Sequence, residues 1–275
     1  MDVLAARDFE SAIDEVSRGG RYFFLEEQLY YLLCARRASR LRDFAAGVTK
    51  RRPGRIDRAE FEKAFREYAS RASIPCLIDT KAEFEIRSRG EADIRDYAFD
   101  FLIVTEKEAF ARLLLLNGFH FHHRAAVVSR GGFPRPLFEH FVNTAREFQD
   151  VLPVCLHDAS PSGLSLPDFA RREWGFGEER LVMDAGLRPR DFLEKTSRLF
   201  TSTVDPARDA SPQGDFASHD FAGAEYRGRL TDRENDFLDR GLRLELANLA
   251  PHALMTMLGR YLRRRKRERS VFFAD

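Results

Sequence analysis

The sequence predicts an α/β protein in which a mostly parallel sheet follows an N-terminal helical part. Two short apolar runs, residues 100–105 and 151–156, are each followed within two residues by a carboxylate and then by a helical pattern. Parallel strands need crossover connections, usually helices, so strands that alternate with helices favour a parallel sheet. The 275 residues allow one large or two modest domains.

Composition excludes few functions. The chain has 45 Lys and Arg against 44 Asp and Glu, so its net charge of +1 does not by itself indicate a nucleic-acid partner. Cys34, Cys76 and Cys155 lack metal-ligand spacing, and we interpret them as small buried residues in a reducing compartment. We see neither a signal peptide nor an apolar run long enough to cross a bilayer. We therefore expect a cytoplasmic protein with no membrane partner.

The first third of the chain predicts three helices. Residues 7–17 place Phe9, Ile13 and Val16 on one face, and a second helix is expected over residues 22–44. Asp57 is a suitable N-cap for a third helix that runs to about residue 72.

Two short strands, residues 76–79 and 83–86, are expected to follow these helices. Three helices and a small ribbon within about a hundred residues are typical of a winged helix. We therefore predict a winged-helix-like domain over residues 1–97 and an α/β domain with C-terminal helices over residues 98–275.

The α/β domain is expected to alternate strands with helices. The predicted strands are residues 100–105, 125–129, 151–156 and 180–184. The predicted helices are residues 107–117, 136–149 and 164–174, with one opening at Thr231 or Asp232 and a last one from Pro251. Residues 203–228, rich in Ser, Asp, Gly, Pro and Ala, are expected to form a long loop.

Carboxylates follow two of these strands. Glu106 comes directly after the first, and Asp158 follows the third by two residues. The carboxyl ends of parallel strands form the ligand-binding edge of an open α/β sheet. Two carboxylates there suit Mg²⁺, which commonly takes one or two and fills its other positions with water or phosphate. The alternative is that both carboxylates are favourable charges at helix starts.

The same segments resemble the Toprim domain, the Mg²⁺-binding module of topoisomerases, primases and related nucleases. Toprim domains carry a Glu after the first strand and Asp-x-Asp after the third; here these positions hold Glu106, Asp158 and, in place of the second Asp, Ser160. Residues 127–134 and 158–163 are similar to the Gly-Gly-Phe-Pro turn and the Asp-Ala-Asp-Pro-x-Gly motif of topoisomerase VI A subunits.

This resemblance implies roles for individual residues. Glu106 would be a general acid/base or a metal ligand, and Asp158 a metal ligand beside Ser160. Arg130, Gly131 and Gly132 would contact phosphate, because glycine permits close backbone approach. Asp184 is an alternative source of the missing carboxylate, although the residues that follow it resemble a family segment that does not usually bind metal.

A second resemblance lies at Glu27-Gln28-Leu29-Tyr30-Tyr31. It is similar to the Arg-x-x-Tyr-Tyr motif of topoisomerase VI A subunits and the meiotic double-strand-break nuclease, with Glu27 in place of Arg. By resemblance Tyr31 would be the nucleophile that attacks a DNA phosphate. The alternative is that Tyr30 and Tyr31 are core-edge aromatic residues of a helix.

Two further clusters admit two interpretations each. Three histidines within residues 119–124 suggest a metal site, but we favour an exposed loop or edge. The last predicted helix carries a basic run that marks either phosphate contact or a solvated helix end. The run consists of Arg260, Arg263, Arg264, Arg265, Lys266, Arg267 and Arg269.

Two functions follow from the resemblance. The first is Mg²⁺-dependent DNA cleavage, by Tyr31 or by metal-activated water as in the Toprim nuclease subunit of Wadjet plasmid defence. The second is a degenerate Toprim protein that binds DNA and a partner ATPase without cutting. The families that the chain resembles work with a separate ATPase of GHKL or SMC type, so the resemblance implies such a partner, and it also implies a homodimer. The sequence contains no P-loop, so any energy input is expected to come from that partner.

Overall fold

The computed structural model describes residues 4–45, 56–84, 98–177, 179–193, 199–203 and 225–272, without the side chains of 39–45 and 269–272. It divides the chain into two compact units. Unit 1 comprises residues 1–79, 198–200 and 247–254, and unit 2 comprises residues 80–197, 201–246 and 255–275. The first division falls after residue 79, earlier than the boundary expected after residue 97.

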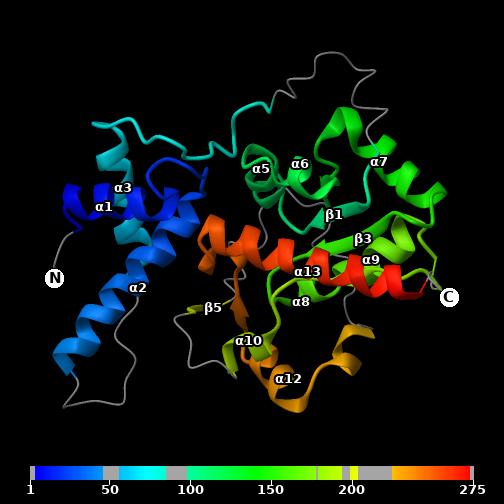
Figure 1. The fold of residues 1–275 in the computed structure, drawn as a ribbon. Coiled ribbons are helices and arrows are strands. Elements are labelled where there is room, and N and C mark those ends of the chain that lie inside the picture. The colour runs from blue at the N-terminus through cyan, green and yellow to red at the C-terminus, as the bar shows by residue number, and fades with distance from the viewer. Residues whose placement is uncertain are drawn as a thin grey trace. The chain divides into compact units, whose positions relative to one another are not determined.

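Unit 1 is built on three helices, α1 (Ala6–Ser17), α2 (Glu26–Ala45) and α3 (Arg58–Ala69), drawn in blue and cyan in Figure 1. The predicted helices are therefore confirmed. Their shared core is aromatic: the Phe9 ring lies 6.2 Å from Phe61, and Tyr30 lies 5.1 Å from Phe61. Tyr30 also donates its hydroxyl to the Ile56 carbonyl at 2.9 Å, which satisfies the one polar atom of a buried ring.

The winged-helix prediction is not confirmed. Phe24 forms a single parallel bridge with Leu77. The Phe24 N–H donates to the Cys76 carbonyl and the Ile78 N–H donates to the Phe24 carbonyl, both at 2.9 Å. Because this bridge holds Phe24 extended, α2 begins at Glu26 and not at residue 22. The described part of residues 76–84 forms no ribbon, and positions 85 and 86 of the second predicted strand lie outside the described residues.

The N-cap of α3 has a measurable effect. Asp57 accepts a hydrogen bond from the Glu60 N–H at 3.0 Å, as the sequence predicted. We expect Asp57→Ala to lower the free energy of unfolding by about 1 kcal/mol, because it leaves this N–H without its cap. Chemical denaturation measures the loss. Asp57→Ser restores a capping oxygen and should recover most of it; an equal loss in both variants would contradict the capping role.

Unit 2 contains a parallel four-stranded sheet in the order β2-β1-β3-β4. The strands are β1 (Phe101–Thr105), β2 (Ala125–Ser129), β3 (Leu152–Leu156) and β4 (Met183–Asp184). The predicted mixed α/β fold with a Rossmann-like parallel sheet is therefore confirmed. Every residue of β1 and β2 is buried, which explains why these strands are continuous apolar runs and not alternating ones.

One or two helices follow each of these strands. They are α5 (Glu108–Leu116), α6 (Phe119–His123), α7 (Arg135–Glu147), α8 (Pro161–Leu164), α9 (Leu166–Glu173) and α10 (Pro189–Leu193). One face of the sheet, with Leu102, Val104 and Val128, packs in a core cluster with Phe141 of α7 and Leu166 of α9.

The histidine-rich segment is a helix and not the exposed loop or edge that we predicted. Gly118, with φ +68°, forms the turn between α5 and α6, so that α6 begins at the next residue. Phe119 is buried, and its ring lies 4.3 Å from the ring of His123. The burial of Phe119 therefore packs α6 against the rest of unit 2.

The rest of unit 2 includes a two-stranded antiparallel sheet that the sequence did not predict, β5 (Thr201–Thr203) with β6 (Leu242–Leu244). Unit 2 also contains η2 (Glu225–Arg229) and α12 (Asp232–Asp239), whereas η3 (Leu246–Asn248) begins in unit 2 and its last two residues belong to unit 1. Thr231, one of the two cap residues predicted, caps α12 in a capping box with Glu234. Most of the predicted loop, residues 204–224, lies outside the described residues, and its end is helical in η2.

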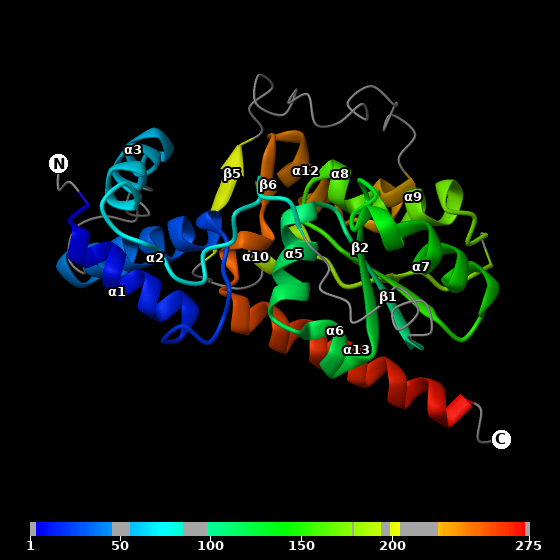
Figure 2. The same cartoon turned by 90° about the horizontal axis from the view of Figure 1, so that it is seen from above.

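The final helix, α13 (Pro251–Phe272), runs beside α6 in unit 2 (Figure 2). Leu258, Gly259 and Leu262 form its buried face. A methyl group at Gly259 would lie 2.8 Å from His123 Nε2, so this glycine allows α6 and α13 to approach closely.

Candidate functional site

The sheet order places a topological switch point between β1 and β3. The chain moves from β1 outward to β2, then returns to the other side of β1 for β3. At such a point the connections diverge and leave a crevice outside the carboxyl ends of the strands, where ligands bind in open α/β sheets. Glu106 follows β1 and Asp158 follows β3, so both predicted carboxylates lie at this edge.

The structure brings the three predicted ligand positions together. The Asp158 N–H donates to Glu106 Oε2 at 3.1 Å, and the Ser160 hydroxyl lies 3.5 Å from Glu106 Oε1. The Ser160 hydroxyl also caps α8 by accepting from the Gly163 N–H at 3.0 Å. Ser160 therefore has a structural role that a helix start requires, beside its position near Glu106.

Gly163 is what allows this compact arrangement. A methyl group at its Cα would lie 2.2 Å from the Asp158 carbonyl oxygen and 2.8 Å from Glu106 Oε2. No side chain fits there, so the start of α8 packs directly on the acid pair, by which we mean Glu106 and Asp158.

Both oxygens of the Asp158 carboxylate are bound by groups of the protein. Lys107 Nζ donates to Oδ2 at 2.6 Å, and the Leu246 N–H donates to Oδ1 at 2.7 Å. The Asp158 side chain is 3% exposed, whereas that of Lys107 is 47% exposed. A half-exposed lysine side chain thus pairs its ammonium with a buried carboxylate and neutralises it.

The charges of the site act on one another. Burial raises the pKa of Glu106, and the negative charge of Asp158 raises it further. Burial alone would lower the pKa of Lys107, but the carboxylates of Asp158, Glu106 and Glu245 raise it above its usual value. Lys107 is therefore a permanent cation, and it is the charge that compensates the acid pair.

These observations test whether Mg²⁺ fits the acid pair. Mg²⁺ needs oxygen ligands at about 2.0–2.1 Å in near-octahedral geometry. Here Asp158 is bonded to a cation and to a backbone amide, Glu106 has a raised pKa, and Ser160 supplies a neutral hydroxyl. Within the described residues, no group of three or more His, Cys, Asp or Glu side chains is gathered so that it could hold a metal ion. The arrangement does not fit a bound Mg²⁺ while Lys107 stays in place.

His157 forms a second charged contact beneath the same edge. Its Nδ1 lies 2.8 Å from the Asp158 carbonyl oxygen, and its Nε2 lies 3.0 Å from Asp184 Oδ1. Since both partners only accept, both ring nitrogens donate, and the ring is an imidazolium. Burial opposes this charge, but the hydrogen bond and charge of Asp184 raise the pKa of His157 above its usual value.

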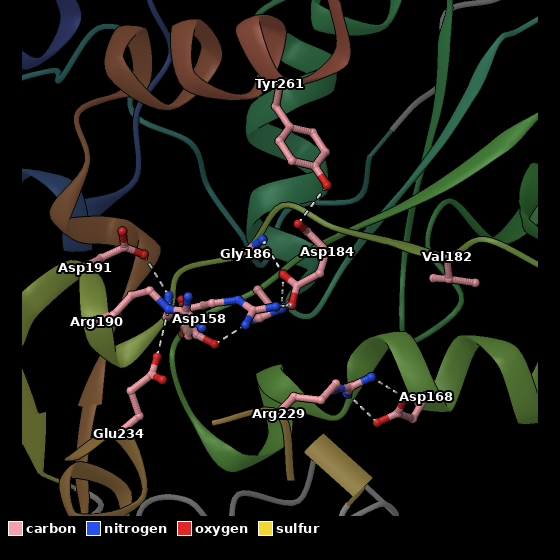
Figure 3. A network of polar contacts seen from close by, with 12 residues as sticks. Asp158, Asp168, Val182, Asp184, Gly186, Arg190, Asp191, Arg229, Glu234 and Tyr261 are labelled. Atoms are coloured by element: carbon pink, nitrogen blue, oxygen red, sulfur yellow. Dashed lines mark hydrogen bonds and ion pairs between the residues drawn. The ribbon is translucent and has the colours of Figure 1, made fainter. Parts of the chain in front are cut away.

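Asp184 is held by several donors (Figure 3). Besides His157, its carboxylate accepts from Arg188 at 2.8 Å and from the Gly186 N–H at 3.1 Å. Burial opposes the effect, but the hydrogen bond and charge of His157, with Arg188, lower the pKa of Asp184 to about 2. The Asp184 carboxylate thus bonds to His157 and Arg188, and among the contacts of the described residues it makes no hydrogen bond to Glu106 or Asp158. Asp184 therefore does not take the ligand position where Ser160 stands in place of the family's second Asp.

The predicted phosphate contacts lie after β2. The Arg130 N–H donates to the Thr105 carbonyl at 2.8 Å, and its guanidinium lies 4.3 Å above the Phe169 ring, with Nη1 3.3 Å from the Ser162 hydroxyl. Gly132 has φ +84°, a conformation that favours glycine. Arg130 is thus held at the same edge as the acid pair. Burial lowers the pKa of Arg130, and the negative charge of Glu106 opposes this effect.

Tyr31 lies in unit 1, whereas Glu106 lies in unit 2. The Tyr31 side chain is buried at 3% exposure, and its ring lies 5.2 Å from Tyr30 and 6.5 Å from Phe200. Glu27, which stands where the resembling family has Arg, lies 3.9 Å from Arg58. The position predicted for a nucleophile is thus an aromatic core position of unit 1.

The basic helix is not at the acid edge. Lys266 of α13 pairs with Asp100, which precedes β1, whereas Glu106 follows β1. The helix carries a basic stripe of exposed side chains at one-face helical spacing: Arg260, Arg263, Arg264 and Arg267. Arg265 lies 5.4 Å from the Tyr261 ring centre and pairs with Glu268.

Sequence reasoning missed two groups of the site. Lys107 follows Glu106 directly and was available as a signal, since a lysine beside a predicted carboxylate is a candidate counter-ion. The Leu246 N–H was not, because it comes from a short segment 88 residues beyond Asp158. Backbone donors of this kind leave no trace in the side-chain pattern.

The histidines of α6 do not gather at one point. Burial lowers the pKa of His120 to about 4, and burial with the charge of Arg263 lowers the pKa of His123. His123 packs on Gly259. In the part of the chain that is described, these residues form no metal cluster.

Comparison with known proteins adds no family. No protein-family model matches the chain, and no curated protein matches it. None of the described helices combines the length and the apolar character that crossing a membrane requires.

Proposed function

We propose that this chain is a Toprim-like DNA-binding protein whose acid pair does not cut DNA. The observation that carries the proposal is the state of Asp158: Lys107 and the Leu246 N–H bind both of its carboxylate oxygens. Cleavage of the Toprim kind needs carboxylate oxygens that are open to a metal ion. An acid pair whose charge is neutralised by Lys107 stabilises the carboxyl edge of the sheet and does not hold a metal ion that activates water.

The basic stripe of α13 supports DNA as the partner. Four exposed arginines on one helix face present a row of cations, and binding to a phosphate backbone depends on such charges. They account for the proposed binding without a large positive net charge, since the chain as a whole carries only +1. Arg130, Gly131 and Gly132 are the proposed phosphate contacts at the opposite edge of the sheet. By resemblance we extend the proposal to a homodimer that works with a separate ATPase.

A second candidate is Mg²⁺-dependent DNA cleavage. It is favoured by one observation, the direct contact of Glu106 with the Asp158 N–H across the switch point at 3.1 Å. In that case Glu106 and Asp158 would hold the metal, which would activate water, and Lys107 would have to leave Asp158 first.

One experiment separates the two candidates. The full-length protein is incubated with supercoiled plasmid in Mg²⁺ or Mn²⁺, with Glu106→Ala in parallel, and half of each sample is run after detergent and protease. We expect retarded but intact plasmid with both proteins. Nicked or linear product that depends on the metal and on Glu106 would reject the binding proposal in favour of cleavage, and protease-sensitive retention of broken DNA would implicate Tyr31.

The DNA-binding half of the proposal has its own variant. Neutralising Arg260, Arg263 and Arg264 together to Gln should weaken binding and reduce the slope of log affinity against log salt by about 2–3, since each phosphate contact contributes about 0.9. Fluorescence anisotropy with a short duplex measures both quantities.

The matched control neutralises Arg227, Arg233 and Arg240, exposed arginines of the η2 and α12 region, which changes the net charge equally. It should leave the salt slope within error of the wild type. Equal effects of the two triple variants would mean that general charge, and not the basic stripe, drives the binding.

A further inference from the structure

We infer that Lys107 is a built-in counter-ion that stands where a divalent cation would serve the acid pair, and that it masks a latent cation site. The inference rests on the proposed function for the meaning of the acid pair. It goes further in assigning the exclusion of metal to a single side chain.

The position of Lys107 carries the first step. Lys107 is the N-cap residue of α5 and follows Glu106 directly, yet its ammonium lies 2.6 Å from Asp158 Oδ2 on the neighbouring strand. Lys107 thus follows β1 in the chain but pairs with the carboxylate that follows β3, and the negative charges of Glu106 and Glu245 also act on it. A cation bridging two strand ends in this way does what a metal ion does at such an edge.

The Lys107 side chain is far more exposed than the Asp158 carboxylate that it neutralises. Asp158 is buried and Glu106 is partly buried, so both are fixed by the fold, whereas about half of the Lys107 side chain is open to solvent. Replacing Lys107 by a neutral residue removes the compensating charge without removing a core side chain. The two carboxylates would then remain close together with no cation between them, and a buried carboxylate without a counter-charge attracts one strongly.

The site that this change uncovers has oxygen ligands. Glu106 and Asp158 supply carboxylates, and the Ser160 hydroxyl lies 3.5 Å from Glu106 Oε1. Hard divalent cations such as Mg²⁺ and Mn²⁺ prefer these donors, and water completes their shell. The latent site therefore takes a hard divalent cation, and not a soft one that favours thiolates.

Direct cation binding tests the inference without DNA or activity. Full-length wild type, Lys107→Met, Lys107→Gln and the charge-retaining control Lys107→Arg are titrated with Mn²⁺ at pH 8, and the free ion is followed by electron paramagnetic resonance. We expect no site in the wild type or in Lys107→Arg. Both neutral variants should gain one site at least about tenfold tighter than any wild-type binding, because a unit charge a few ångströms away is removed.

Dependence on the acid pair completes the design. Adding Asp158→Asn to Lys107→Met should abolish the gained site, and circular dichroism confirms that each variant is folded. Two outcomes overturn the inference: wild-type Mn²⁺ binding that Asp158→Asn removes, or folded neutral variants that gain no site. Neither outcome bears on DNA binding by the basic stripe, which the salt slopes measure separately, so the two proposals fail independently.

Discussion

Gly163→Ala is expected to lower the free energy of unfolding by about 3 kcal/mol, at the upper end of the cost of overpacking a core. The added methyl group would lie 2.2 Å from the Asp158 carbonyl oxygen, which is backbone and cannot rotate away. It would also lie 2.8 Å from Glu106 Oε2. Relief requires the start of α8 to move, and that movement breaks the Ser160 cap and separates the acid pair.

Chemical denaturation of purified variants measures this loss. The matched control is Gly228→Ala in η2, where an added Cβ would meet no atom within 4 Å and no positive φ is required. It should change stability by no more than about 0.5 kcal/mol, as is usual for exposed positions. Equal losses at both positions, or none at Gly163, would show that the β3–α8 connection is looser than its contacts indicate.

Asp184→Asn is expected to lower the free energy of unfolding by about 3 kcal/mol near pH 6, because it leaves the buried imidazolium of His157 without its counter-charge. The pKa of His157 is raised in the folded protein, so its contribution is fully present below the unfolded value of about 6.5. That contribution is lost as pH rises through the higher folded pKa. The cost of Asp184→Asn should therefore be largest near pH 6 and shrink toward pH 9.

The acid side of the same pair follows the opposite sign. The pKa of Asp184 is lowered to about 2 from an ordinary 3.8, so its contribution is present above 3.8 and lost as pH falls toward 2. Between pH 5 and 9 Asp184 stays ionised, and His157 alone determines the change that this pair contributes.

Urea unfolding at intervals from pH 5.5 to 9 measures both curves. Arg188→Gln is the control, since it removes a different partner of Asp184 and leaves the contact with His157 in place. Its stability curve should run parallel to that of the wild type above pH 6. A parallel curve for Asp184→Asn as well would mean that His157 is neutral in the folded protein.

Much of unit 2 was predictable because its elements are local. The runs that form β1, β2 and β3 are continuously apolar, and each strand lies within one residue of its predicted bounds. The Asp57 and Thr231 caps also have short-range signals. Such features depend on neighbours within a few residues, which a single sequence displays.

What could not be predicted depends on distant partners. The pairing of Phe24 with Leu77 shortens α2 from its N-terminal side, although the local pattern there is helical. The three-residue strands β5 and β6 are too short for an alternation pattern, and their pairing joins segments about forty residues apart. At the acid pair, the carboxylates were predictable from the strand ends and Lys107 was visible beside Glu106, whereas the pairing of Lys107 with Asp158 and the bond from the Leu246 N–H required the tertiary contacts.

The link from Asp158 to Leu246 joins segments that are synthesised at different times. The same segment is fastened twice more, by the Ala159 N–H to the Leu244 carbonyl at 2.8 Å and by the return bond at 3.2 Å. These bonds span more than eighty residues, and closing a long loop costs entropy before its contacts repay it. During synthesis the β1–β3 region therefore emerges well before Leu244 and Leu246. Of the two groups that bind the Asp158 carboxylate, Lys107 is synthesised first and the Leu246 N–H last.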